Sequence, residues 1–145
     1  MHPALVALVV VLALAVSTAG GWAVTRLVLH LASRSSDAGE PLSGPDGAVL
    51  LRGKLVESDG PDGARAQAVL RGGTWVGLLE RLATTGALIV GEPTAVAVVV
   101  AVKGLGRYPE LRENPGASER FVIGSFASLL WAASIGLLAR RLLAR

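Results

Sequence analysis

The sequence predicts an all-α, helical integral membrane protein with three or four membrane segments, two of which form a short helical hairpin. Residues 3–33 carry one charged side chain, Arg26, and residues 121–139 carry none. Residues 33–73 hold five basic and six acidic side chains, so long apolar segments alternate with a solvated one. With 52% apolar residues and a mean hydropathy of +0.56, this pattern is typical of membrane anchors joined by linkers.

The first segment, residues 1–32, is predicted to be an N-terminal transmembrane helix. A helix of about 20 residues already spans the hydrocarbon core. The alternative is a cleaved signal peptide, because Ser17 and Ala19 fit a small-residue cleavage pattern. No Lys or Arg precedes the apolar run, however, and its apolar character continues past Trp22 to Leu31, which favours an uncleaved anchor.

Residues 33–73 are predicted to be a polar linker rich in Gly, Pro and Asp. Asp-Gly and Pro-Asp-Gly are strong helix breakers and mark turns or disorder. Within the linker, residues 62–71 fit one short helix capped by Asp62. We expect no separate core here.

Residues 75–107 allow two architectures. In one, residues 82–102 form a single span with Glu92 at the midplane, at a cost of about 2.5–3.5 kcal/mol for the buried carboxylate. In the other, Gly91-Glu92-Pro93 is a turn between two shorter helices. Gly then stops the first helix, and Pro begins the second where its missing N–H costs nothing. The hairpin needs only these ordinary rules and is the preferred interpretation.

The hairpin also predicts a charge pair. Glu80 lies twelve residues before Glu92, and Lys103 lies eleven after it. In two antiparallel helices both side chains then sit about 17 Å from the turn. Opposite charges at one depth can pair, which lowers the cost of holding either near the membrane.

The membrane module is predicted to cover residues 74–139. After the hairpin, residues 108–120 form a polar connection with two prolines. The second transmembrane helix is predicted at residues 120–139, followed by a basic tail at 140–145.

Stripes of small residues indicate helix-packing faces. Ala13, Ser17 and Gly21 recur at every fourth position of the first segment. In the last helix the same spacing recurs, with Ser125 beside the stripe formed by Gly124, Ser128, Ala132 and Gly136. Small side chains let membrane helices approach closely, within one chain or between copies.

Enzyme chemistry lacks support in the sequence, so we expect no catalytic residues, cofactor or metal. The chain has no cysteine, and its two histidines, His2 and His30, have no neighbouring ligand or nucleophile. Ser125 therefore has no visible base. The net charge of +3 comes from basic residues at the edges of apolar segments, which argues against nucleic-acid binding.

The C-terminal half resembles a family of bacterial integral membrane proteins of uncharacterised activity. The family pattern reads I-G-x-L-E-R, an apolar run, a Lys, an Arg-aromatic pair, then E-Y-x-x-I-G-T-x-x-S. The matching residues here are Gly77, Glu80, Arg81, Lys103, Arg107, Tyr108, Glu119, Ile123, Gly124, Ser125 and Ser128. Ser125 stands where the family has Thr, and Arg120 where it has Tyr. The resemblance implies one charged cluster at a membrane face, made of Glu80, Arg81, Lys103, Arg107 and Glu119.

These observations lead us to expect a small polytopic protein of the bacterial inner membrane with a structural, assembly or accessory-subunit role. Its partners would be the lipid bilayer and either further copies of the chain or other membrane subunits. The alternative is transport of ions or small solutes, or a holin-like pore, with Glu80 or Glu92 facing water. Counting basic residues in the loops favours an N-terminus outside the cell.

Overall fold

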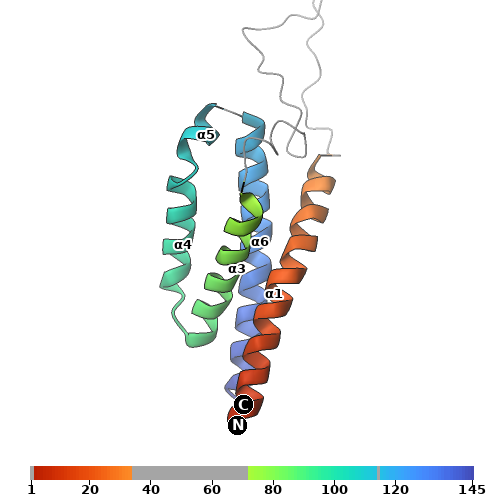
Figure 1. The fold of residues 1–145 in the computed structure, drawn as a ribbon, viewed down its shortest axis with the longest axis vertical. Coiled ribbons are helices and arrows are strands. Elements are labelled where there is room, and N and C mark those ends of the chain that lie inside the picture. Colours follow the sequence, from red (N-terminus) through yellow and green to blue (C-terminus); the bar gives the residue numbers. More distant parts are fainter. Residues whose placement is uncertain (1, 34–71, 114) are drawn as a thin grey trace, which may run out of the picture.

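The computed structural model describes residues 2–33, 72–113 and 115–145, and all regular structure in these ranges is helical. Figure 1 shows the four longest helices running along the long axis of the molecule, with the shortest helix at one end and both termini at the other. We call these the α5 end and the terminal end. The helices are α1 (Pro3–Ala32), α3 (Gly73–Val90), α4 (Thr94–Leu105), α5 (Tyr108–Glu113) and α6 (Pro115–Leu143). The predicted all-helical fold class is confirmed for these residues.

Three helices form the centre of the bundle. α6 packs against both α1 and α3, and α1 also packs against α3. α4 is attached through α3, and α5 lies against α6. No residue of α4 is buried, so this helix contributes to the outside of the bundle.

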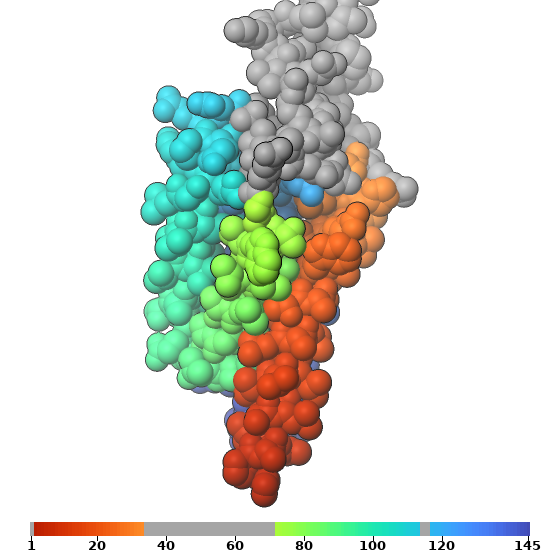
Figure 2. Space-filling model, viewed as in Figure 1, coloured from red at the N-terminus to blue at the C-terminus, as the bar shows by residue number. Residues whose placement is uncertain are grey.

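The polarity of the bundle is reversed relative to a soluble protein. Its buried residues include four hydroxyl side chains and two charged ones, namely Ser17, Thr84, Thr85, Ser128, Glu80 and Arg81. Its exposed residues include many large apolar ones, such as Leu12, Phe126 and Leu130, each more than half exposed. α1, whose surface carries many of them, forms one side of the molecule in Figure 2. In soluble proteins large apolar side chains are the ones most often buried.

Both predicted stripes of small residues lie inside the bundle. Ala13, Ser17 and Gly21 are all buried on α1. On α6, Ser128, Ala132 and Gly136 are buried, whereas Gly124 and Ser125 are partly exposed. A Cβ atom at Gly136 would lie 2.9 Å from Cβ of Leu88 and 3.1 Å from the carbonyl oxygen of Thr85. α3 and α6 therefore approach this closely only because Gly136 has no side chain.

Thr85 joins all three central helices. Its hydroxyl lies 2.6 Å from Oγ of Ser17 on α1 and donates to the carbonyl oxygen of Ala132 on α6 at 3.2 Å. Thr85 has one hydroxyl proton and the carbonyl can only accept, so Ser17 must be the donor to Thr85. The chain of donation runs from α1 through α3 to α6.

The chain reverses direction between α3 and α4. Gly91 has φ of +91°, and its N–H and that of Glu92 both donate to the carbonyl of Ala87, at 3.0 and 2.8 Å. Glycine adopts this left-handed conformation without strain, which ends α3. Pro93 is the N-cap of α4, which begins at Thr94, whereas the sequence predicted Pro93 at the first helical position. Two helices flank the turn, so the alternative of a single span over 82–102 is wrong.

The last helix is longer than predicted at both ends. Residues 108–120, expected as a polar connection, contain α5 and the first turns of α6. Pro115 suits the first position of a helix, where no N–H is needed. Residues 140–143 of the expected tail continue α6, because Arg140 and Arg141 complement the negative end of the helix. The predicted linker features, including the helix at 62–71, lie outside the described residues.

Replacing Thr85 with Val should lower the free energy of unfolding by about 1–2 kcal/mol, since two interhelical hydrogen bonds are lost without a change of shape. Titration of the purified protein in detergent with SDS, followed by far-ultraviolet circular dichroism, measures this. Thr18→Val is the matched control, because the Thr18 hydroxyl bonds only the carbonyls of Leu14 and Ala15 in its own helix. Equal losses in both variants would contradict the role given to Thr85.

Alanine substitutions at two glycines should have opposite effects. Gly86→Ala should stabilise the protein by about 0.5–1 kcal/mol, because alanine favours helix and nothing lies within 4 Å of its Cβ position. Gly136→Ala should destabilise it by about 1–3 kcal/mol through overpacking between α3 and α6. The same SDS titration measures both changes, and a gain of stability at Gly136 would refute the close approach.

Candidate functional site

An ion pair fastens α4 to α3. Nζ of Lys103 donates to Oε2 of Glu80, and the two side chains are 15% and 2% exposed. The pairing is the one predicted from their equal distances to the turn. The Lys103 ammonium also lies 5.3 Å from the centre of the Phe121 ring on α6, close enough for a cation–π contact. The other oxygen of Glu80, Oε1, is buried and has no hydrogen-bond partner among the residues that the structure describes.

Arg81 points in a different direction from Glu80. Its side chain is buried, with the residue 5% exposed, and Nη1 donates to Oγ of Ser128 on α6 at 3.2 Å. On the α1 side it fills the space left by Gly21, where a Cβ atom would overlap Cδ of Arg81 and lie 2.9 Å from Nε. Its Nε is buried and has no hydrogen-bond partner in residues 2–33, 72–113 and 115–145. Within the part of the chain that the structure describes, Arg81 makes no ion pair.

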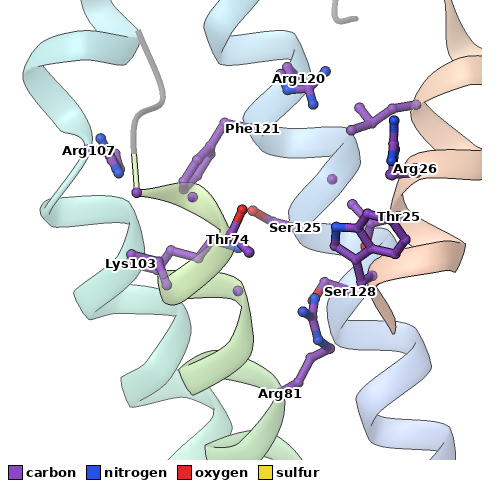
Figure 3. Close-up of a pocket in the computed structure, with 17 residues that line it drawn as sticks. Thr25, Arg26, Thr74, Arg81, Lys103, Arg107, Arg120, Phe121, Ser125 and Ser128 are labelled. Carbon is purple, nitrogen blue, oxygen red and sulfur yellow. The ribbon is translucent and has the colours of Figure 1, made fainter. Parts of the chain in front are cut away.

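A cavity of about 390 Å³ lies above Arg81, between α1, α3, α4 and α6. Figure 3 shows Arg81 and Ser128 at one end of this cavity and Arg120 at the other. Among its described lining residues there is no Asp or Glu. The lining includes five cationic side chains, from Arg26, Arg81, Lys103, Arg107 and Arg120, and four hydroxyl groups, from Thr25, Thr74, Ser125 and Ser128.

Further hydrogen-bonding groups of the wall lack partners among the described residues. Oγ1 of Thr25 and Oγ of Ser125 are buried and have no hydrogen-bond partner in this part of the chain. The N-terminus of α3, at Gly72 and Gly73, also lines the cavity and has no side-chain cap. The first N–H groups of a helix carry partial positive charge. The described wall is thus electropositive and contains hydroxyl and backbone N–H groups that a ligand could engage.

The predicted charged cluster is present only in part. Arg81, Lys103 and Arg107 line the cavity, with Glu80 behind Lys103, and Arg107 also lies 3.7 Å from Glu110. Glu119 is exposed and is not among the described residues that line the cavity, so its part in the cluster stays a prediction. On α6 it points about 100° around the helix from Arg120, which does line the cavity.

Other lining residues were missed by the sequence prediction, although a signal for some of them existed. Extending the spacing of Gly124 and Ser128 back by four residues reaches Arg120, and extending that of Ser17 and Gly21 forward reaches Thr25. Both positions lie on the inner face of their helix. Arg26 neighbours this stripe, and its guanidinium lies 4.9 Å from the centre of the Trp22 ring.

The turn residues lie far from the cavity. Gly91 is next to the guanidinium of Arg140, with a Cβ position 3.0 Å from one of its nitrogens, near the terminal end of α6. Glu92 and Pro93 are exposed. His2 is also at the terminal end, where its Nδ1 accepts the N–H of Ala4 at 3.3 Å and caps α1. His30 is exposed, and neither it nor His2 is among the described residues that line the cavity beside Ser125.

Two of the described helices are long and apolar enough to cross a membrane, at Pro3–Ala32 and Ala117–Leu143. Comparison of the chain with protein-family models, curated proteins and solved structures gave no match. The resemblance of the C-terminal half to a bacterial membrane family stays a prediction. What the arrangement offers chemically is binding of an anion by arginines and hydroxyls.

Exchanging the charges of the ion pair tests its contribution. Glu80→Lys alone should destabilise the fold by about 3–5 kcal/mol, because it leaves two cations facing each other in a buried site. Adding Lys103→Glu should restore part of this loss. The folded fraction is measured by size-exclusion chromatography in detergent and by SDS titration. The matched control is Glu119→Lys at an exposed position, which should behave as wild type; full stability of Glu80→Lys alone would count against the pair.

Proposed function

We propose that this chain is a small multi-pass protein of the bacterial inner membrane with a structural role, as an assembly or accessory subunit. The observation that carries the proposal is the reversed polarity of the bundle, with hydroxyl and charged side chains inside and large apolar side chains outside. In lipid, helices associate through small residues and interhelical hydrogen bonds, because apolar surface gains nothing by leaving an apolar solvent.

The long apolar helices fit a soluble core or a signal peptide less well than a membrane anchor. The core helix of a soluble protein is mostly buried, whereas the apolar windows of α1 and α6 are 11% and 17% buried. A cleaved signal peptide needs no place in the mature fold. α1, however, is bonded to α3 through Ser17, and its Val16 carbonyl accepts the Trp131 indole N–H of α6 at 3.3 Å. These contacts support a retained membrane anchor.

The first arm of the hairpin, α3, has dimensions that support a crossing. Along α6, the twenty residue-to-residue steps from Arg120 to Arg140 rise about 30 Å, the thickness of the hydrocarbon core. The cavity brings the start of α3 close to Arg120, and the turn at Gly91 lies beside Arg140. With its 18 residues α3 rises about 27 Å, close to this thickness. α4 is shorter, with 12 residues, and α5 follows it. We therefore propose four membrane segments, with the N-terminus outside.

A structural role accounts for the acidic residues better than a pore does. Glu80 is held in a buried ion pair, and Glu92 is exposed at a turn. Neither position suggests an acid along a water-filled path. The assembly role is supported by α4, which packs mainly on α3 and exposes Val98, Val102 and Leu105. This surface suits lipid, a second copy of the chain or another membrane subunit.

Single cysteines report the topology without interference, because the chain contains none. In intact cells, a membrane-impermeant maleimide should label cysteine at His2 and at Glu92, but not at Glu113 in α5, which should react only after the cells are opened. Thr84→Cys, at a buried position, is the protected control and should react only in the denatured protein.

Other labelling patterns would contradict the proposal. Protection of position 92 together with position 84 would replace the crossing hairpin by a re-entrant one. Equal labelling of all four positions in intact cells would refute the membrane location. Leakage of cells that produce the wild-type protein, abolished by Glu80→Gln, would favour a pore over a structural role.

A further inference from the structure

The buried charges at the floor of the cavity do not balance. Glu80, Arg81 and Lys103 supply two cations for one carboxylate, and that carboxylate is engaged by Lys103. The Arg81 guanidinium is left with the neutral hydroxyl of Ser128 as its described hydrogen-bond partner. A buried, unpaired charge is costly, so an additional anion next to Arg81 would stabilise this arrangement.

We propose that the cavity is a binding site for a phosphate group. The groups that would hold it come from all three central helices: Arg81, Thr25 and Ser125 line the cavity, and their Nε, Oγ1 and Oγ atoms have no hydrogen-bond partner among the described residues. A phosphate oxygen can accept from each of them. Arg26 and Arg120, which also line the cavity, add positive charge around the site. Side chains with unused donors thus line the cavity from three different helices.

The size and chemistry of the cavity favour phosphate over smaller anions. A volume of about 390 Å³ is within the usual range for an organic ligand and far exceeds a monatomic ion. Arginine offers a planar pair of donors that matches phosphate geometry, and phosphate has several strong acceptor oxygens. The uncapped N-terminus of α3 at Gly72 and Gly73 adds backbone donors and partial positive charge, an arrangement that suits phosphate.

The position of the cavity admits two sources of the phosphate group. From Arg120 to Ser128 the site extends eight residues along α6, about 12 Å of helix rise. If the protein is embedded as proposed above, Arg120 lies at headgroup level, and an anionic phospholipid would bind with its phosphate drawn below that level into the cavity, toward Arg81. Val76, Leu29 and Phe121 provide apolar walls for the rest of such a lipid. Free inorganic phosphate carries the same chemistry, so the experiment separates the two.

Binding is measured on the full-length protein, purified in a neutral detergent, by native mass spectrometry and by thermal unfolding. Three probes are added in separate titrations: phosphatidylglycerol, phosphatidylcholine and inorganic phosphate. We expect the wild type to retain one phosphatidylglycerol about tenfold more tightly than phosphatidylcholine, because the neutral choline lipid carries a compensating cation. If millimolar inorganic phosphate displaces the lipid or raises the melting temperature by itself, the source is free phosphate. If it does neither, the source is the lipid.

Variants assign the binding to this cavity. Arg81→Met should weaken phosphatidylglycerol binding about tenfold, whereas Arg140→Met, which removes a cation at the terminal end, should leave it unchanged. Should Arg81→Met fail to fold, the double variant Thr25→Val and Ser125→Ala retains every charge and should weaken binding severalfold. The proposal is overturned if phosphatidylglycerol binds no more tightly than phosphatidylcholine and phosphate has no effect. Unchanged affinity in Arg81→Met or in the double variant also overturns it. Because these measurements are made in detergent, their failure would leave the topology result untouched.

Discussion

The hydrogen bonds of the Thr85 hydroxyl are the contact on which the rest of the bundle depends. They link α1, α3 and α6 at one point, through Ser17 on one side and the Ala132 carbonyl on the other. Thr85 can reach both only because the helices touch, and they touch because Gly136 and Ala132 have little or no side chain there. Small residues and interhelical hydrogen bonds therefore act as one constraint on the packing of the helices. The small residues let the helices approach, and the hydrogen bonds form only at that short distance.

The same constraint creates the cavity. α1 and α3 are held together at Ser17 and Thr85, and Gly21 lies only one turn further toward the α5 end. In Figure 1, α1 leans away from α6 in this direction. The space that opens receives the Arg81 side chain first, at Gly21 and Ser128, and the cavity lies beyond it. Close packing on one side of Arg81 and separation on the other thus place a buried cation at the floor of a polar cavity.

Local rules predicted much of this arrangement, whereas the rotation of each helix had to come from the structure. Gly91-Glu92-Pro93 ends one helix and starts another by backbone chemistry alone, and equal spacing from that turn places Glu80 opposite Lys103. Periodicity also identified the inner faces of α1 and α6. Equal distance from the turn does not say which way α3 faces around its axis, however. Glu80 and Arg81 are neighbours in sequence but point about 100° apart, so a cluster expected as one unit divides between α4 and the cavity.

This division explains how a structural ion pair can maintain an anion site. Glu80 is adjacent to Arg81, and an acid so placed could neutralise it. Lys103 engages Glu80 instead, while Arg81 is directed by Gly21 and Ser128 to the opposite side. The pair that fastens α4 therefore withdraws the nearest carboxylate from the cavity, and the positive charge of its floor persists. The pairing of Glu80 with Lys103 therefore has two consequences: it attaches α4 to α3, and it leaves Arg81 available for the proposed phosphate.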